Sequence, residues 1–278
     1  AEAICQQAPL ANRYPDVRAQ DLRKKLAEKH GLSVDEVMVT EGATAGLGFI
    51  AEVFIQPGDE IILTPPTYPS YYNYVKRCRG KLVEVPLEED TLTPDFNKVL
   101  AAITDKTKAI FLCNPNNPTG YLYTRREMDR IRDLVRKYDL FLFSDEVYRE
   151  FIYTGSPYIS ACHLEGVEQN VVLIDSVSKR YSECGIRIGA LITKNKKLRD
   201  AVMKFCQARL SPPLIGQIVA EASIDAPRSY STEVYEEYIE RRKCLIDGLN
   251  RIPGVYSPIP MGAFYTCLLY TSDAADDK

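Results

Sequence analysis

The segment LIDSVSKRYSECGIRIG, residues 173–189, places a lysine directly after what reads as a buried strand. The apolar run ends in an acid and two serines ahead of Lys179, and Arg187 follows eight residues later, between two glycines. A solvated surface lysine needs neither a strand before it nor a glycine-flanked arginine after it. We therefore interpret this segment as part of a binding site at the end of a strand.

Strand-like and helix-like segments alternate outward from this point. The strand-like runs are 36–40, 60–64, 81–87, 108–113, 140–145 and 171–176. The helix-like runs between them are 43–55, 71–80, 94–104 and 125–138. Strands that are apolar at nearly every position are typical of a parallel sheet covered on both faces. The alternation predicts an α/β doubly wound domain, a mostly parallel sheet sandwiched by helices.

The bulk composition is that of an ordinary globular protein. The chain has 278 residues, is 45% hydrophobic and 26% charged, and carries a net charge of −3. It has no basic excess for nucleic acid, no polybasic tail for a membrane, and no apolar run long enough to span one. Its start shows no secretion signal, and its eight cysteines include no CxxC pair. We expect a cytoplasmic protein with reduced thiols and no metal, although Cys162 and His163 could contribute to a zinc site.

Two groups of residues at strand ends suit a phosphate. Gly42 permits a tight turn after the first strand, and Ala43 and Thr44 then open a helix with free backbone N–H groups. After the strand 171–176, two serine hydroxyls and the guanidinium of Arg187 offer further donors. An ordinary strand–helix turn remains the alternative for the first group.

The other strand ends carry groups for a flat ring. Tyr68 can stack on a planar ligand, or pack beneath its own loop. The loop NPNNPTG at 114–120 offers Asn117, and Tyr148 follows the next strand. Asp145 ends that strand, where a buried carboxylate needs a cation or donors; a salt bridge to a neighbouring arginine is the alternative.

Taken together, these groups match one cofactor, pyridoxal phosphate. A lysine in a partly desolvated pocket can act as a nucleophile toward carbonyls. A lysine with an aspartate partner for the pyridinium nitrogen is the protein signature of this cofactor. The phosphate cradle and the aromatic side chain complete the set.

The sequence resembles the class I and II aminotransferases of pyridoxal-phosphate fold type I over about residues 1–266. NPNNPTG, DEVY and SVSKRYSECGIRIG match the motifs of that family in order and at its usual spacing. The resemblance implies that Lys179 binds the cofactor as a Schiff base, that Asp145 pairs with the ring nitrogen, and that Tyr68 stacks on the ring. It also implies that Asn117 and Tyr148 hold the 3-oxygen. The phosphate ligands that it implies are Ala43, Thr44, Ser176, Ser178 and Arg187.

The resemblance also bears on partners and substrates. Tyr14, in NRYPD, matches a family tyrosine that reaches the phosphate of the neighbouring subunit, which implies a homodimer. Segments 175–193 and 207–217 look like bacterial aspartate aminotransferases, whereas NRYPD and PPTYPSYY are also similar to histidinol-phosphate aminotransferases. We rank aspartate, or a broad acidic and aromatic set of amino acids, first. A decarboxylase or lyase on the same scaffold, and a non-catalytic effector domain of a regulator, remain alternatives.

The chain also departs from the family pattern. An N-terminal family segment should precede Ala1, and no arginine that could hold a substrate carboxylate follows Arg251. We divide the chain into an N-terminal segment (1–30), a large cofactor-binding domain (31–228), a connecting helix with the start of a truncated small domain (229–266), and a tail (267–278). The tail resembles translated adaptor DNA from sequencing libraries. We expect it to be non-native and to pack against nothing, and the chain to be a fragment.

Overall fold

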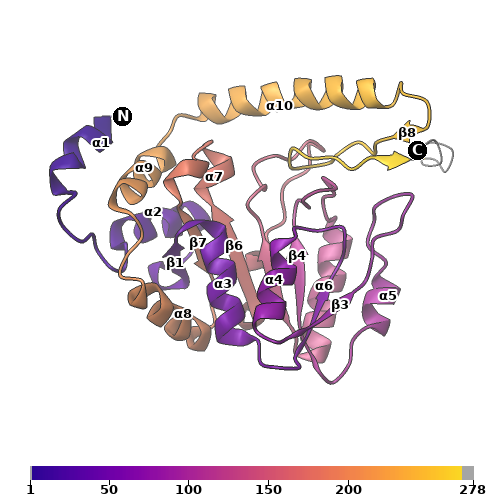
Figure 1. The fold of residues 1–278 in the computed structure, drawn as a ribbon, viewed down its shortest axis with the longest axis horizontal. Coiled ribbons are helices and arrows are strands. Elements are labelled where there is room, and N and C mark those ends of the chain that lie inside the picture. The colour runs from indigo at the N-terminus through magenta and orange to yellow at the C-terminus, as the bar shows by residue number, and fades with distance from the viewer. Residues whose placement is uncertain (1, 271–278) are drawn as a thin grey trace.

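The computed structural model describes residues 2–270, and a seven-stranded sheet lies at its centre (Figure 1). Its strand order is β1-β7-β6-β5-β4-β2-β3. The strands are β1 (Val37–Thr40), β2 (Glu60–Leu63), β3 (Lys81–Glu84), β4 (Thr107–Cys113), β5 (Phe141–Asp145), β6 (Val171–Ser176) and β7 (Gly189–Ile192). All neighbouring pairs are parallel except those made by β7, which runs antiparallel to β1 and β6. The prediction of a mostly parallel sheet is confirmed.

Helices cover both faces of this sheet. On one face, α3 (Gly42–Phe54), α4 (Ser70–Arg77) and α8 (Lys196–Ala208) pack on side chains such as Ile61 and Leu63. On the other, α5 (Phe96–Ala101) and α6 (Arg125–Tyr138) pack on the alternate residues, such as Ile62. Helices α2 (Gln20–His30) and α9 (Leu214–Ile224) extend that second layer over β1 and β7. Because both faces are covered, the central strands are apolar at most successive positions.

The two ends of the chain lie outside this sandwich. Helix α1 (Glu2–Gln7) packs against α9 at one end of the molecule. The 22-residue helix α10 (Arg228–Leu249) covers the region where the sequence predicted a connecting helix, and it crosses above the sheet in Figure 1. None of the described helices is long and apolar enough to cross a membrane.

One expectation for the tail is wrong. Strand β9 (Leu269–Tyr270) pairs antiparallel with β8 (Val255–Tyr256), so the start of the tail does contact the chain before it. The tail begins with four hydrophobic residues, CLLY at 267–270, and backbone hydrogen bonds join two of them to β8. The rest of the tail, 271–278, lies outside the described residues.

The sheet brings the predicted strand ends together. Thr40 at the end of β1 and Ser176 at the end of β6 both lie opposite Gly189 of β7. Cys113, the last residue of β4, is in register with Asp145, the last residue of β5. The loops that follow these four strands therefore start at one edge of the sheet, where open α/β sheets bind ligands.

Candidate active site

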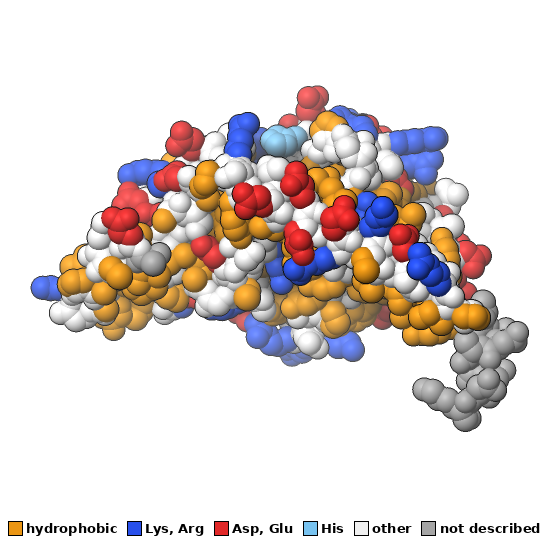
Figure 2. Space-filling view, turned by 90° about the horizontal axis from the view of Figure 1, so that it is seen from above, with side chains coloured by type: hydrophobic (Ala, Val, Ile, Leu, Met, Phe, Trp, Pro, Cys, Tyr) orange, Lys and Arg blue, Asp and Glu red, His pale blue; other side chains and the backbone are white. Residues whose placement is uncertain are grey.

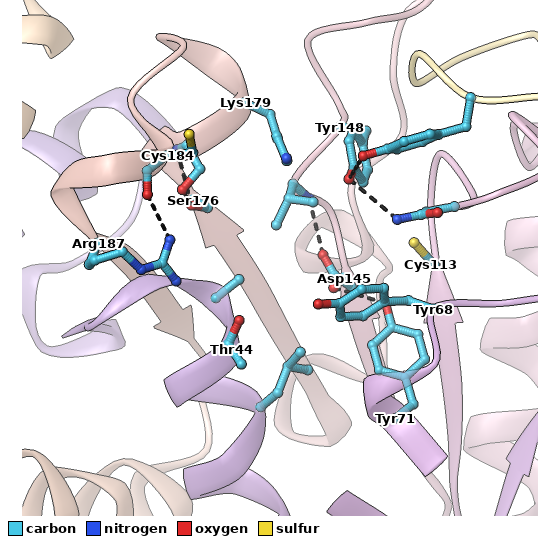
Figure 3. Close-up of a pocket in the computed structure, with 16 residues that line it drawn as sticks. Thr44, Tyr68, Tyr71, Cys113, Asp145, Tyr148, Ser176, Lys179, Cys184 and Arg187 are labelled. Carbon is cyan, nitrogen blue, oxygen red and sulfur yellow. Dashed lines mark hydrogen bonds between the residues drawn. The ribbon is translucent and has the colours of Figure 1, made fainter. Parts of the chain in front are cut away.

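A cavity of about 380 Å³ opens at this edge (Figure 3). Its walls come from the start of α3, the loop before α4, the ends of β4, β5 and β6, and the short helix α7 (Val177–Arg180). The residues that line it are Ala43, Thr44, Leu47, Tyr68, Tyr71, Cys113, Asn117, Asp145, Val147, Tyr148, Ser176, Ser178, Lys179, Cys184, Arg187 and Tyr265. Every site residue predicted from the sequence is in this set except Tyr14.

One side of the cavity suits an anion. Gly42 starts α3 with a φ of +73°, and no side chain caps the first turn of that helix. The guanidinium of Arg187 lies directly over Gly42, in the space that a Cβ would fill. Arg187 donates a 2.8 Å hydrogen bond to the Cys184 carbonyl and makes no ion pair within the described residues. A free helix N-terminus beside an arginine without a carboxylate partner is a phosphate site in chemical terms.

Ser176, the last residue of β6, lies on the same side of the cavity as Arg187 (Figure 3), and Ser178 follows it in α7. Ser176 Oγ is 2.9 Å from Ser178 Oγ, and it accepts a hydrogen bond from the backbone N–H of Ser178 at 3.1 Å. Ser176 thereby caps α7 and orients both hydroxyls. Gly189 lies behind them, where a Cβ would come within 2.5 Å of the backbone nitrogen of Ala43. Only glycine allows this close approach of β7 to α3.

The opposite side holds a buried carboxylate without a cation. Asp145 is 4% exposed and makes no ion pair within the described residues, so the salt-bridge alternative is wrong. Its carboxylate accepts hydrogen bonds from the Tyr71 hydroxyl at 2.8 Å and the Val147 N–H at 3.2 Å. Burial raises the pKa of Asp145 to about 6, against the effect of these two donors. Such a carboxylate would be stabilised by a cationic ring nitrogen.

A hydroxyl pair forms the far wall. The Tyr148 hydroxyl lies 3.0 Å from the Tyr265 hydroxyl and accepts a hydrogen bond from Asn117 Nδ2 at 3.4 Å. Burial, and then the bond to Tyr265, raises the pKa of Tyr148 far above its usual value, so the phenol stays protonated. A protonated phenol beside an amide can donate to a ligand oxygen.

Lys179 lies between these walls, with its side chain pointing into the cavity (Figure 3). Its Nζ is 5.9 Å from the centre of the Tyr148 ring and 5.7 Å from that of Phe264. Lys179 makes no salt bridge among the described residues. Of the residues that line the cavity, only Lys179 and Arg187 are basic, and arginine does not lose its proton. Lys179 is thus the amine available for covalent chemistry.

The structure separates the functional from the structural asparagines. Asn114 accepts a hydrogen bond from the Tyr123 N–H, and Asn116 donates to the Pro66 carbonyl and to the Thr119 hydroxyl. These two side chains hold the loop, and only Asn117 lines the cavity. Tyr14 is 81% exposed and lies outside the cavity of its own chain.

Sequence reasoning missed four polar or sulfur-containing residues of the cavity: Tyr71, Cys113, Cys184 and Tyr265. Tyr71 could have been found, because it lies one helical turn after Tyr68 in the same aromatic segment. Cys113 is the last residue of β4 and is in register with Asp145 on the neighbouring strand β5. Tyr265 comes from the distant segment GAFYT and carries no local signal.

Comparison with known proteins agrees with this geometry. The family model Aminotransferase class I and II matches residues 1–277. The chain belongs to this family. Members of the family are transferases that use pyridoxal phosphate, so the activity to expect of the chain is that of an aminotransferase.

Several relatives share this sequence and fold. The aspartate/prephenate aminotransferase of Thermus thermophilus is 32% identical, and the match covers 95% of this chain and 70% of the relative. Histidinol-phosphate aminotransferase 2 of Carboxydothermus hydrogenoformans is 31% identical over 93% of this chain and 70% of its own. The solved alanine aminotransferase of Pyrococcus furiosus superposes with a TM-score of 0.90 at 33% identity, covering 97% of this chain and 72% of its own. The chain thus spans about 70% of the length of these aminotransferases.

The cavity fits the cofactor of the family. The cation-free carboxylate of Asp145 suits the ring nitrogen, and Arg187, the two serines and the start of α3 suit the phosphate. Lys179 lies between the two walls. These are the three anchor points that a pyridine aldehyde phosphate requires.

Proposed function

We propose that this aminotransferase moves an amino group between aspartate, or a broad set of acidic and aromatic amino acids, and a 2-oxo acid. Lys179 is its catalytic residue. The observation that carries the proposal is that the Lys179 amine and the buried, cation-free carboxylate of Asp145 face one cavity. A purely structural lysine or aspartate has no reason to be placed in this way.

Each residue of the cavity has a role in this proposal. Asp145 holds the proton on the ring nitrogen, while Asn117 and Tyr148 hold the phenolic oxygen. Tyr68 stacks on the ring. The phosphate is held by Ala43, Thr44, Ser176, Ser178 and Arg187.

The chemistry follows from this placement. Pyridoxal phosphate, when bound, supplies an electron sink for the carbanion that forms at the substrate α-carbon. With the cofactor bound, Lys179 Nζ would hold it and would be the base that carries the proton leaving the substrate α-carbon. The aromatic rings of Tyr148 and Phe264 flank this amine.

Borohydride labelling tests the cofactor site. The chain is incubated with pyridoxal phosphate, reduced and digested, and peptides are mapped by mass spectrometry. We expect the label on Lys179, and a Lys179→Ala variant should lose it. Lys194, just beyond β7 at the opposite end of that strand, is the matched control, because Lys194→Ala should leave the labelling intact. Label on other lysines alone would overturn the proposal.

The substrate class rests on weaker similarity. Relatives that are 32% and 31% identical to this chain are named aspartate/prephenate and histidinol-phosphate aminotransferases, so histidinol phosphate is the second candidate. Half-reactions of the cofactor-loaded chain, without borohydride reduction, with aspartate, phenylalanine and histidinol phosphate would separate them. Formation of pyridoxamine phosphate identifies transamination, whereas release of carbon dioxide or an alkene product would indicate a decarboxylase or lyase.

Tyr14 supports the proposal of a homodimer. It lies after α1, in a segment where Leu10 is 49% and Val17 is 37% exposed. Figure 2 shows hydrophobic side chains gathered at both ends of the face that it draws. A second copy of the chain would cover such residues and could bring Tyr14 to the phosphate end of the cavity.

A further inference from the structure

A second row of charged residues lies directly behind the cavity. Each member is the chain neighbour of a residue that lines the cavity. The pairs are Tyr148 with Arg149, Ser176 with Asp175, and Lys179 with Arg180. Consecutive side chains in a strand, or in one helical turn, point in different directions. Each pair therefore sends one side chain into the cavity and one into the protein behind it.

The core of this row is an ion pair between Arg180 and Asp175. Both side chains are nearly inaccessible, at 4% and 1% exposure. Arg180 Nη2 donates to both oxygens of Asp175, at 2.8 and 3.0 Å. Arg180 Nε also donates to Glu150 Oε1 at 2.7 Å. One guanidinium thus ties the start of α7 to the loop that follows Tyr148.

Arg149 and His30 complete the cluster. His30, at the end of α2, lies 3.0 Å from Asp175 through Nε2. The other ring nitrogen of His30, Nδ1, accepts a hydrogen bond from Arg149 Nη2. The neutral ring therefore carries its proton on Nε2, which faces Asp175. Burial lowers the pKa of His30, consistent with a neutral ring beside two arginines. Burial alone would raise the pKa of Asp175, but Arg180, Arg149 and His30 hold it well below its usual range.

Helix α7 needs such support. It has only four residues, Val177–Arg180, and a single turn is unstable by itself. Ser176 caps the start of α7. The helix ends at Arg180, and a loop that begins at Tyr181 leads to the 3-10 turn Cys184–Ile186. Arg180 is the residue of the turn that is anchored on two carboxylates. What it anchors is the backbone that carries Lys179.

We propose that Arg180 and Asp175 are positioning residues that set Lys179 against Tyr148, an inference that rests on the cofactor role proposed for Lys179. Arg180 fixes the helical turn that carries Lys179 to Asp175. Its contact with Glu150, the residue next to Arg149, fixes the same turn to the loop that carries Tyr148. Removing the clamp lets the amine drift from its place between the two walls of the cavity. The fold persists, because the hydrophobic clusters on the two faces of the sheet do not include these charged side chains, although Asp175 itself belongs to β6.

The test uses Arg180→Lys, Arg180→Met and Glu150→Gln in the chain as it exists. Lysine keeps the charge but loses the bidentate fork, and Glu150 is 41% exposed, so its amide variant should fold. Arg136→Met is the matched control, because Arg136 is an exposed arginine on α6 whose one ion pair within residues 2–270 is with Asp133. Two readouts are taken: the dissociation constant for pyridoxal phosphate, and the midpoint pH of the absorbance change of the Lys179-bound cofactor. Circular dichroism monitors the fold.

We expect Arg180→Met to weaken cofactor binding by about tenfold or more and to shift the midpoint by roughly one pH unit, with native circular dichroism. Arg180→Lys and Glu150→Gln should shift both in the same direction by less, and Arg136→Met should shift neither. If Arg180→Met does not fold, the two milder variants decide. The inference is overturned if Arg180→Lys and Glu150→Gln leave both the cofactor affinity and the midpoint pH unchanged. It is also overturned if the variants lose stability without a shift in the midpoint pH. Failure of the unmodified chain to label at Lys179 would instead overturn the proposed function.

Discussion

Tyr71 donates a 2.8 Å hydrogen bond to Asp145, and both side chains are buried. Tyr71 comes from α4 and Asp145 ends β5, so the bond ties the aromatic wall of the cavity to the sheet. Burial raises the pKa of Tyr71 well above its usual value, so the phenol keeps its proton and acts as the donor. In the cofactor-free chain Asp145 therefore has donors, but no cation among the described residues.

The first prediction concerns stability and pH. The pKa of Asp145 is about 6 in the folded chain, against about 3.9 when unfolded. A raised folded pKa gives stability that is complete below about pH 4 and is lost as pH rises through about 6. At pH 7 the ionised carboxylate costs about 3 kcal/mol of unfolding free energy. Asp145→Asn should therefore make the cofactor-free chain more stable than the wild type at pH 7 but not at pH 4.

Urea unfolding between pH 4 and pH 8 measures this difference. Asp247→Asn is the control, since Asp247 is exposed on α10. Identical pH profiles for the wild type and Asp145→Asn would show that Asp145 is already paired in the folded chain.

The second prediction removes the donor. Tyr71→Phe leaves Asp145 with only the Val147 N–H. An underbonded buried carboxylate costs about 1–3 kcal/mol, so we expect a loss of that size at pH 8. The loss should shrink at pH 5, where the carboxyl group is protonated. Tyr123→Phe is the matched control, because Tyr123 is also buried but its hydroxyl meets only Thr64, at 3.5 Å. A loss independent of pH would mean that Tyr71 acts by packing alone.

The third prediction concerns catalysis. Asp145→Asn should still bind pyridoxal phosphate, because the phosphate ligands and Lys179 are intact. Proton abstraction from the substrate should slow by several kcal/mol in the barrier, about tenfold for each 1.4 kcal/mol, because the ring nitrogen loses its anionic partner. Exchange of the α-proton of a bound amino acid with deuterium measures this step. An unchanged exchange rate would leave Asp145 a structural residue only.

Most of this site could be predicted from the sequence because its residues follow strands. Apolar runs mark the strands, and the topology rule then places Thr44, Asn117, Asp145 and Ser176 at one edge of the sheet. Strand β7 was not predicted, although its glycine allows the close approach to α3. Its antiparallel direction depends on the turn at 181–188, which has no periodic pattern.

Contacts between distant segments were beyond this reasoning. The bond from Tyr265 to Tyr148 joins residues 117 positions apart. The ionic cluster of His30, Arg149, Asp175 and Arg180 likewise assembles only in three dimensions. Periodicity reports which face of an element is buried, and it does not report which polar side chains meet there.

The fourth prediction tests the phosphate end with a matched pair of glycines. Gly42 and Gly31 both have positive φ, +73° and +65°. A Cβ at Gly42 would collide with the Arg187 guanidinium, whereas a Cβ at Gly31 meets no atom within 4 Å. Each alanine variant should lose about 1 kcal/mol of stability from backbone strain. Only Gly42→Ala should also displace Arg187 and weaken binding of pyridoxal phosphate by about tenfold or more. Equal affinities in the two variants would place the phosphate elsewhere.

The last prediction tests whether Tyr14 serves the site of a second chain. In a dimer with shared sites, Lys179→Ala destroys the site of its own chain, and Tyr14→Ala weakens the site of its partner. Mixing the two variants through unfolding and refolding should produce heterodimers with one complete site, formed by Lys179 of one chain and Tyr14 of the other. Labelling of Lys179 at low cofactor concentration should then rise above the mean of the separate variants. Val17→Ala in place of Tyr14→Ala is the control, because it alters the same exposed segment without removing the hydroxyl. If the mixture is labelled no more than the mean of the two separate variants, although sedimentation confirms dimers, Tyr14 acts within its own chain or not at all.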